Sequence, residues 1–498
     1  MAFPAHTALV GLAAALALTF ARVCLRRGLP PGGLIERRPL RANELSVVLV
    51  AVGAALVFRL IGLESRPVDN DEPVGLGLDS LSAWAGEADA RLHPPLPSLL
   101  FTWAGGARDL LHARSVSALA GIACVPLAYA ALRRNSRFAA TLAAVWLAVA
   151  PALLHPSQLA RGYALAAAGV LAQHVCLSKA LERGRERWFM LYALCASLAL
   201  ATEWIVVVPV LLDAALAFRA ARASTSLRVG IVGALGSALA ATSVLAPFAF
   251  PTLWLGVGGG PHAPTGIVRA GSEALAAFSG PAAPASALVC AALVFVAWRR
   301  GVLSHIEARL ASGLVGALAV YLAAALFTAV RARYLLHVVP SFVCVSALAA
   351  ARLGPTARVV GALVVASHAA LLPGYYRGAG AGREVSFGRR TPGILEVLQS
   401  DPRAALAIVP YYSLAEPSWR LLRRFPGADA GHDCPVELCL RAERELYGAS
   451  DASLPELRAR SPRLWVWVRR EDEPALPGCE LTLREAGTSL WRCAGAPP

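Results

Sequence analysis

The chain has 498 residues, of which 57% are hydrophobic and 16% are charged, and its formal net charge is +15. A composition this apolar excludes an ordinary soluble enzyme of this length and indicates a polytopic membrane protein. The positive charge does not indicate nucleic-acid binding, because the basic residues are almost all Arg and lie in short clusters between apolar runs.

Apolar runs of about 17–25 residues, the length that crosses a bilayer core, recur through the first three quarters of the chain. They lie near residues 7–25, 45–63, 113–132, 138–154, 163–178, 188–203, 204–218, 229–250, 284–298, 310–330, 334–351 and 359–374. The sequence therefore predicts about twelve transmembrane helices in residues 1–374. The first run lacks the basic start and the cleavage site of a secretory signal, so it is predicted to remain as a membrane helix.

The basic residues of the intervening loops are unevenly shared between the two sides of the membrane. One side carries twenty, Arg309 among them, and the other carries eight: Arg66, Arg91, Arg108, Arg114, Arg161, Arg269, Arg331 and Arg333. The positive-inside rule places the richer side in the cytoplasm and the poorer side outside. Arg59 falls inside an apolar window near its end, where a long side chain can snorkel to the nearer surface.

An acidic loop, residues 64–112, follows the second window on the predicted outer side. Its first part holds Glu64, Asp69, Asp71, Glu72, Asp79, Glu87 and Asp89 against Arg66 and Arg91. A solvated external loop is one interpretation. The alternative is a functional site, because an ionised side chain at a membrane boundary loses hydration and needs a partner or a function. The loop continues through His93-Pro94-Pro95 into a short amphipathic run.

Two further acids, Glu203 and Asp213, lie inside or beside apolar windows. Intramembrane acids raise the hypothesis of a transport or relay path. As two isolated acids without a matching row of polar residues, they support that hypothesis only weakly.

The composition changes to that of a soluble domain in residues 375–498. The segments "GILEVLQSDPRAALAIVPYYS" and "LPELRARSPRLWVWVRR" each indicate a helix followed by a strand, so a small α/β domain is predicted. The predicted orientation places this domain outside. Its four cysteines, Cys434, Cys439, Cys479 and Cys493, then suggest up to two disulfides in an oxidising compartment.

An ordered series of features resembles the GT-C membrane glycosyltransferases, in particular the group around the protein O-mannosyltransferases and the lipid A aminoarabinose transferases. The features are Asp71-Glu72 after a membrane helix, the His-Pro-Pro-Leu from His93, "PSQLARGYALAAAG" from Pro156, and "RARYLLHVVPSFVCVSALAAARL" from Arg331. The chain departs from the pattern by an extra N-terminal helix and by Glu203 at a position where relatives often carry His or another polar residue.

The resemblance implies transfer of a hexosyl or pentosyl unit from a polyprenyl-phosphate carrier to an acceptor hydroxyl on the outer face. The acceptor would be a lipid, a glycan or a protein. The protein would be a multi-pass protein of the inner or plasma membrane, with its active site and C-terminal domain extracytoplasmic. A membrane transporter or flippase and a non-catalytic scaffold remain alternatives, although inverted repeats with broken helices, expected for many transporters, are not visible in the sequence.

Two acidic residues are the catalytic candidates. An acceptor hydroxyl needs a general base, and Asp71 matches the Asp of the family's Asp-Glu pair. Glu72 would orient the acceptor or hold Arg contacts. A single displacement with a phosphate leaving group needs no second catalytic acid, so no cofactor is required. A divalent metal is conceivable near Asp71, Glu72, Asp79 and His93, but no fixed ligand spacing appears, and no metal site is predicted.

Arg161 and Arg333 are the candidate ligands of the donor phosphate, because guanidinium groups match phosphate oxygens and both residues precede a helix that re-enters the bilayer. The alternative for each is an Arg that anchors lipid headgroups. His93 is a possible contact of the acceptor or of the phosphate, or else a plain loop residue.

Overall fold

The structure is a computed structural model of the whole chain, and it describes most residues between Ala42 and Ala494. The described residues are 42–63, 72, 76, 94–243, 266–279, 284–302, 305–325, 332–376, 392–401, 404–409, 446–448, 458–459, 463–468, 476, 478–485 and 488–494. The predicted first helix near residues 7–25 lies outside them, as do Asp71 and His93.

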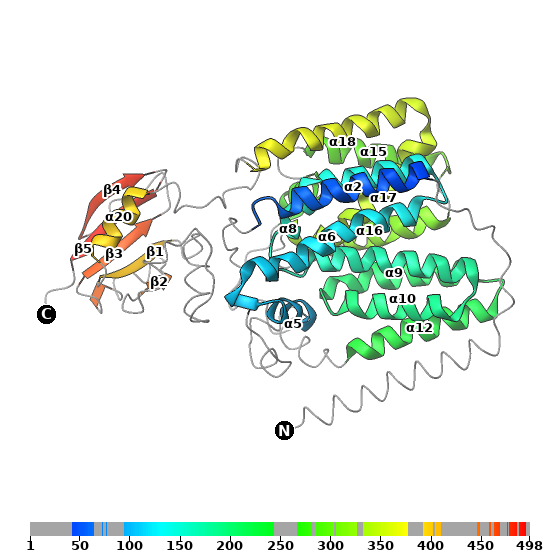
Figure 1. The fold of residues 1–498 in the computed structure, drawn as a ribbon, viewed down its shortest axis with the longest axis horizontal. Coiled ribbons are helices and arrows are strands. Elements are labelled where there is room, and N and C mark those ends of the chain that lie inside the picture. Colours follow the sequence, from blue (N-terminus) through cyan, green and yellow to red (C-terminus); the bar gives the residue numbers. More distant parts are fainter. Residues whose placement is uncertain are drawn as a thin grey trace, which may run out of the picture. The chain divides into compact units, whose positions relative to one another are not determined.

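The described part of residues 42–376 is helical throughout (Figure 1). Its helices are α2 (Ala42–Leu60), α5 (Pro95–Trp103), η2 (Gly106–Arg108), α6 (Leu110–Leu132), α7 (Arg137–Val149), α8 (Pro151–Ser157), α9 (Tyr163–Arg183), α10 (Glu186–Leu200), η3 (Trp204–Val206), α11 (Val207–Ala220), α12 (Thr225–Ser243), α14 (Ile267–Ser279), α15 (Pro284–Arg299), α16 (His305–Ala324), η4 (Ala332–Val338), α17 (Val339–Leu353) and α18 (Pro355–Tyr376). The elements labelled η are 3₁₀ helices.

Six of the described helices are long and apolar enough to cross a membrane: α2, α6, α9, α12, the helix from Arg333 to Leu353, and α18. The pair α7 and α8, bent by 53°, would make a seventh if the two helices form one span. Others that coincide with predicted windows are shorter: α10 has 15 residues, α11 has 14 and α15 has 16. The described residues therefore show a polytopic helical protein, and they do not confirm twelve spans.

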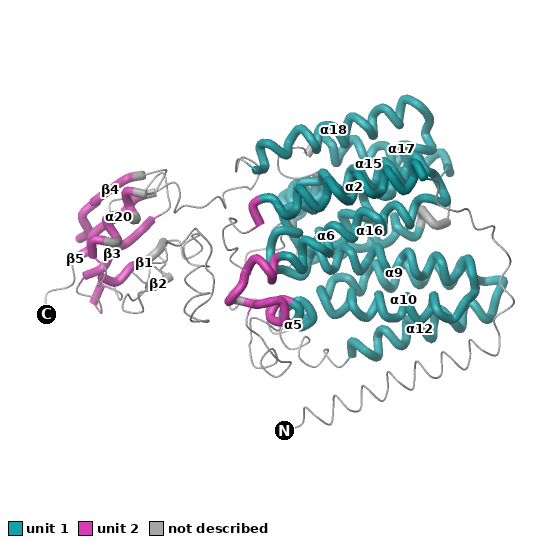
Figure 2. The backbone as a smooth tube through the Cα atoms, viewed as in Figure 1, with its two compact units in different colours: residues 1–61, 78–100, 115–380 teal, residues 62–77, 101–114, 381–498 magenta. Residues whose placement is uncertain are grey.

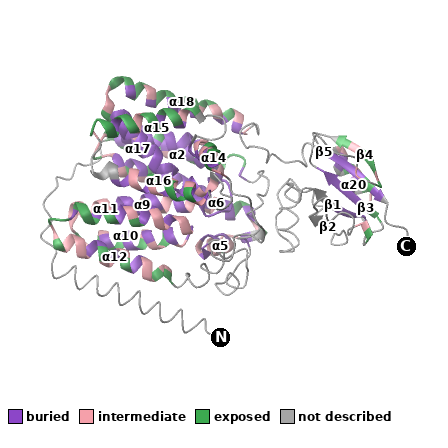
Figure 3. Cartoon of the chain, turned by 180° about the vertical axis from the view of Figure 1, so that it is seen from behind, coloured by how far each residue is buried: buried purple, intermediate pink, exposed green. Residues whose placement is uncertain are grey.

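Helix α17 forms the centre of the largest apolar core. All residues from Val339 to Ala351 are buried, and α7, α15, α16 and α18 pack against this helix. Figure 3 colours the buried residues of the helical bundle purple. A helix that is apolar all round needs such surroundings, whereas α2 and α18 keep one apolar face exposed, as membrane-facing helices do.

The break between α7 and α8 has a local cause. In a continuous helix the carbonyl of Leu147 would accept a bond from the amide of residue 151, but Pro151 has no N–H. Arg59 replaces the missing donor: its Nη2 donates to Leu147 O at 2.8 Å and its Nη1 to Ala148 O at 3.2 Å. The Arg59 side chain is fully buried, so the prediction that it snorkels to the surface is wrong.

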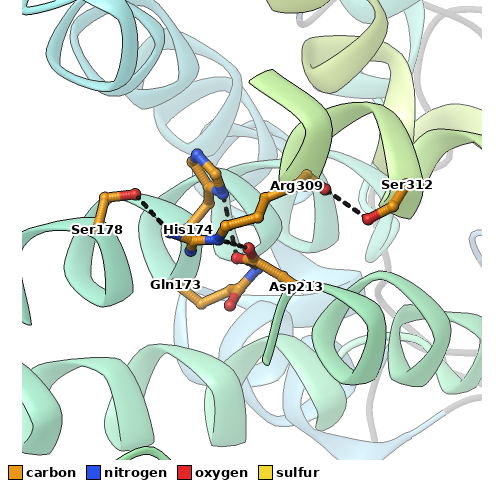
Figure 4. Close-up of polar contacts among 6 residues, drawn as sticks. All are labelled: Gln173, His174, Ser178, Asp213, Arg309 and Ser312. Atoms are coloured by element: carbon orange, nitrogen blue, oxygen red, sulfur yellow. Dashed lines mark hydrogen bonds and ion pairs between the residues drawn. The ribbon is translucent and has the colours of Figure 1, made fainter. Parts of the chain in front are cut away.

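The interpretation of Asp213 as an isolated acid is also wrong. Asp213 accepts bonds from Gln173 and Arg309 and lies 3.1 Å from His174 Nδ1, and the group lies inside the helical bundle (Figure 4). Arg309, counted above among the loop residues, is buried in α16. The sequence could not show this pairing, because the partners of Asp213 come from two other helices, α9 and α16.

The C-terminal segment contains a five-stranded mixed sheet with strand order β2-β1-β3-β5-β4. Its strands are β1 (Ala405–Val409), β2 (Leu446–Gly448), β3 (Arg463–Val468), β4 (Cys479–Glu485) and β5 (Thr488–Ala494). β1 pairs parallel with β2 and β3, and β5 pairs antiparallel with β3 and β4. The helix and strand predicted in "GILEVLQSDPRAALAIVPYYS" are α20 (Pro392–Ser400) and β1.

Both faces of the central strand β3 are apolar. Leu464, Val466 and Val468 belong to one core with Trp491. Trp465 and Trp467 belong to a second core with Ile394 of α20. The alternation in "RLWVWV" therefore separates two buried faces.

The residues divide into two compact units, shown in Figure 2. The first comprises residues 1–61, 78–100 and 115–380, and the second comprises 62–77, 101–114 and 381–498. Two pieces of the predicted acidic loop are thus grouped with the C-terminal segment, and the predicted domain boundary near residue 375 stays a prediction.

A disulfide joins Cys479 in β4 to Cys493 in β5, and the other two cysteines of the tail lie outside the described residues. Closing a loop of this length, with a sequence separation of 14, stabilises a fold by about 3 kcal/mol in the chain-entropy description.

We expect the double variant Cys479→Ala/Cys493→Ala to lose about this free energy of unfolding in the C-terminal segment. Pulse proteolysis of the full-length protein in urea measures it, with cleavage in residues 381–498 followed by mass spectrometry. Cys290→Ala, which removes a free buried thiol of α15, is the matched control and should leave this segment unchanged. Equal resistance of the double variant and wild type would contradict the disulfide's contribution.

Candidate active site

The buried ion pair between Arg114 and Glu72 organises the described part of the acidic loop. Arg114 Nε lies 3.0 Å from Glu72 Oε1 and Arg114 Nη2 lies 2.9 Å from Glu72 Oε2, so the contact is bidentate. Both side chains are 0% exposed. A third bond runs from Arg114 Nη1 to Leu63 O at 3.0 Å. One guanidinium therefore binds the chain on both sides of residues 64–71, the stretch that contains Asp71.

Helix α6 carries Arg114 in its second turn, and Asp109 caps the start of that helix. Asp109 Oδ1 accepts the backbone N–H of His112 at 2.9 Å, as N-terminal capping carboxylates do. This hydrogen bond, with the nearby imidazole, holds the pKa of Asp109 below its ordinary value. The cap is thus charged at neutral pH, and its contribution is lost as the pH falls through the lowered pKa.

Sequence reasoning missed Arg114, which it counted only as one of eight external basic residues. A signal was present: an Arg at the start of a membrane helix, after a loop with a strong excess of acids, is a candidate partner for one of them. Which acid it binds could not be read from the sequence, because eight lie within residues 64–112. The Glu72 carboxylate is committed to Arg114, which agrees with the Arg-holding role considered for it.

Arg161 stands at the entry to α9, in a tight turn. Its backbone N–H donates to Leu159 O at 2.8 Å, and its carbonyl accepts the hydroxyl of Ser117 at 3.0 Å. The guanidinium carbon lies 5.7 Å from the centre of the Tyr163 ring, a cation–π contact. Arg161 is only 6% exposed, which disagrees with a side chain that extends into the headgroup layer.

Gly162 allows three segments to meet beside Arg161. A Cβ at this position would lie 2.8 Å from Pro97 Cγ of α5 and 3.0 Å from Thr202 O. Both distances are shorter than ordinary van der Waals contacts, so a larger residue would push these segments apart. The N–H of Leu96 donates to Ala201 O at 3.2 Å and ties the start of α5 to the end of α10. The turn with Arg161, the segment entering α5 and the α10–η3 junction therefore form one compact junction.

Glu203 is buried at that junction. Its Oε1 would lie 3.4 Å from a Cβ on Gly162, and its side chain is 8% exposed. Glu203, which departs from the family pattern, therefore lies next to the residue that follows Arg161.

Helix η4, which carries Arg333, packs against α9, which begins shortly after Arg161. η4 contacts both α8 and α9, and Leu335, Leu336 and Tyr334 of η4 share one apolar cluster with Tyr163 of α9. Arg333 itself is half-buried. The fold thus brings together the two segments whose Arg residues were the phosphate candidates, although they are far apart in sequence.

The described residues contain no group of three or more His, Cys, Asp or Glu side chains placed to hold a metal ion. Asp71, Asp79 and His93 lie outside those residues, so three of the four ligands considered for a metal are not tested.

Comparison with known proteins supports the resemblance noted in the sequence. The sequence profile of the dolichyl-phosphate-mannose-protein mannosyltransferase family matches residues 93–253. The fold is similar to apo ArnT from Cupriavidus metallidurans, with a TM-score of 0.57 and 14% identity over 91% of this chain and 98% of ArnT. It is also similar to ArnT from the same organism bound to undecaprenyl phosphate, with a TM-score of 0.53 and 14% identity over 90% and 98%.

An arabinosyltransferase, EmbB from Mycobacterium smegmatis, matches more weakly, with a TM-score of 0.47 and 16% identity over 70% of this chain and 34% of EmbB. No curated protein matches this sequence. The chain therefore has the fold of a GT-C membrane glycosyltransferase, and about a third of it, residues 93–253, matches the profile of such a family.

We expect Glu72→Leu and Arg114→Met each to lower the free energy of unfolding by about 3–5 kcal/mol, because each leaves the other charge of the pair buried without its partner. The double variant Glu72→Leu/Arg114→Met should be markedly more stable than either single variant. Chemical unfolding of the full-length protein in detergent measures this double-mutant cycle.

The matched control is Arg134→Met, which removes an ion pair with Glu182 from the surface. Arg134 is 40% exposed, and exposed pairs contribute about 0–1 kcal/mol. Additive effects of the two single variants, without recovery in the double variant, would contradict a coupled buried pair.

Proposed function

We propose that this protein is an integral-membrane glycosyltransferase that moves a hexosyl or pentosyl unit from a polyprenyl-phosphate carrier to an acceptor hydroxyl on the outer face of the membrane. The observation that carries the proposal is the likeness to ArnT, which extends over nearly the whole of both chains. One of the two ArnT structures contains undecaprenyl phosphate, and the matching profile is named for a dolichyl-phosphate donor. Both carriers are polyprenyl phosphates.

Asp71 is the proposed general base. Deprotonation of the acceptor hydroxyl by a positioned carboxylate accelerates such a reaction by about 10²–10⁴-fold. Glu72 is a poor candidate for this step because both its oxygens bind Arg114. Its proposed role is to hold Arg114, which also binds Leu63 O at the other end of the segment 64–71. His93 is kept as a proposed contact of the acceptor or of the phosphate.

Arg161 and Arg333 are the proposed ligands of the donor phosphate. As the sugar leaves, the lipid phosphate gains negative charge, and a guanidinium can bind two of its oxygens without losing its own charge. The burial of Arg161 and the packing of η4 against α9 support this assignment, because a partly desolvated cation interacts more strongly with a phosphate than one in water does. The proposed displacement uses no cofactor.

The proposed location of the site and of the C-terminal segment is extracytoplasmic, in the inner or plasma membrane. The distribution of basic residues supports this orientation. The Cys479–Cys493 disulfide supports it independently, because structural disulfides persist mainly in oxidising compartments.

We expect Asp71→Asn to lower kcat for sugar transfer by about 10²–10⁴-fold while the affinity for the lipid-linked donor stays near that of wild type. Transfer by the purified protein in lipid nanodiscs, from a panel of polyprenyl-phosphate sugars to envelope lipid, glycan and peptide fractions, measures kcat. Asp69→Asn is the matched control, as a neighbouring acid with no assigned role. A wild-type kcat in folded Asp71→Asn protein would refute Asp71 as the base.

We expect Arg161→Lys and Arg333→Lys to raise the donor KM by about tenfold or more, because Lys keeps the charge but loses the bidentate geometry. The acceptor KM should change little. Arg269→Lys is the control, since Arg269 lies on the same predicted side but is exposed and pairs with Glu273 in its own helix. An unchanged donor KM in both variants would show that neither residue binds the phosphate.

A further inference from the structure

A buried polar cluster links α9, α11 and α16 (Figure 4). Arg309 Nε of α16 lies 2.6 Å from Asp213 Oδ1 of α11. On the other carboxylate oxygen, Gln173 Nε2 and His174 Nδ1 of α9 lie at 3.2 and 3.1 Å. Arg309 Nη1 also donates to Ser178 Oγ of α9 at 3.3 Å. One ion pair therefore binds side chains from three helices.

Burial makes this cluster energetically demanding. Asp213 is 2% exposed and Arg309 is 3% exposed, so neither charge is hydrated. An ion pair in such surroundings often contributes no more to stability than well-packed apolar residues would, because desolvation offsets the attraction. Net stabilisation is therefore a weak explanation for its presence, and a role in specifying one arrangement of the helices is the alternative.

Glycines in α16 bring that helix very close to α11 beside the ion pair. A Cβ on Gly316 would lie 2.1 Å from Leu212 Cδ1, and a Cβ on Gly313 would lie 3.1 Å from Pro209 Cβ. Small residues at a helix interface permit this close approach in membrane proteins. Arg309 meets Asp213 and Gly313 meets Pro209, so the residue numbers rise along α16 as they fall along α11, and the two helices run antiparallel.

Apart from Gly313 and Gly316, the contact surface specifies the axial position of α16 poorly. The other residues of 310–324 are mainly Ala, Leu and Val, so over most of the surface a slide of one turn would exchange similar apolar side chains. The ion pair removes that ambiguity, because a shift of one turn, about 5.4 Å, would leave Asp213 and Arg309 buried without each other. The penalty falls on every wrong register and not on the correct one.

The register of these helices bears on the candidate phosphate ligands. η4, which carries Arg333, packs against both α9 and α16. α9 begins at Tyr163, directly after the turn that holds Arg161. η4 also contacts α14 and α17, so the position of α16 along α9 is one of the contacts that bear on where η4 rests relative to that turn.

We propose that Asp213 and Arg309 are positioning residues for the donor: their buried ion pair fixes the register of α9, α11 and α16 and thereby sets the spacing between Arg161 and Arg333. The proposal rests on the function assigned to those two Arg residues above. Neither Asp213 nor Arg309 contacts the donor in this proposal.

The test is the double variant Asp213→Leu/Arg309→Met, which replaces the ion pair by apolar side chains and should keep the thermal unfolding midpoint close to wild type. We expect the donor KM to rise by about tenfold, because small displacements of binding groups weaken binding, with kcat within about twofold of wild type. Arg309→Lys, which keeps the charge with poorer geometry, should give an intermediate KM and serves if the double variant fails to fold.

A second measurement does not depend on activity. Spin labels at Leu211 of α11 and Val315 of α16, both exposed, report the register of the two helices when the native free cysteines are replaced by alanine. Wild type should give one narrow distance distribution, and the double variant a broadened or shifted one. His368→Leu is the matched control: it removes a buried polar link between Trp146 and Ser286, and both measurements should stay at wild-type values.

A donor KM at the wild-type value in folded double variant overturns the proposal, whatever the distances. A raised KM with an unchanged distance distribution also overturns it, because the register would then not be the cause. Failure of the proposed function gives a different result, in which wild-type protein transfers no sugar or the Arg161→Lys and Arg333→Lys variants bind donor normally. The distance measurement then still decides whether the ion pair fixes the register.

Discussion

A charged group inside an apolar helical bundle must have its hydrogen-bonding capacity met by the protein, because no water is available to meet it. Three buried Arg side chains meet most of this requirement in different ways, although Arg59 Nε and Arg309 Nη2 have no hydrogen-bond partner among the described residues. Arg59 binds the Leu147 carbonyl, which Pro151 leaves without a donor, and the adjacent Ala148 carbonyl. Arg114 binds Glu72 and Leu63 O, and Arg309 binds Asp213 and Ser178. The α7–α8 break, the contact to Glu72 and the packing of α9, α11 and α16 all involve these guanidinium groups.

The same constraint connects structure to the proposed chemistry. Arg114 binds Leu63 O and Glu72, the described residues on either side of the segment that contains the proposed base. Arg161 is buried at a junction that only a glycine at position 162 permits. A desolvated cation beside a restrained turn is a suitable partner for a phosphate, and the packing of η4 against α9 brings the segment of Arg333 to the same helix.

Hydropathy alone predicts the helices that coincide with apolar windows. Helices α10 and α11, for example, lie at the adjacent windows 188–203 and 204–218. Strand β1 and helix α20 followed from periodicity and turn signals. The errors concern polar residues within apolar runs. Arg59, Asp213 and Arg309 were interpreted from their position along the chain, as a snorkelling, an isolated and a loop residue, whereas each has partners distant in sequence. Hydropathy carries no information about such partners.

The membrane character of the chain, the uneven distribution of basic residues, the candidate site residues and the resemblance to GT-C glycosyltransferases can all be read from the sequence, because they depend on composition, local order and short motifs. The pairing of Glu72 with Arg114, the burial of Arg161 beside Gly162 and Glu203, and the joining of three helices at Asp213 emerge from the folded structure alone. Burial and pairing of a charge depend on which helices pack together. In a bundle of similar Ala- and Leu-rich helices, that choice is made by a few long-range polar contacts.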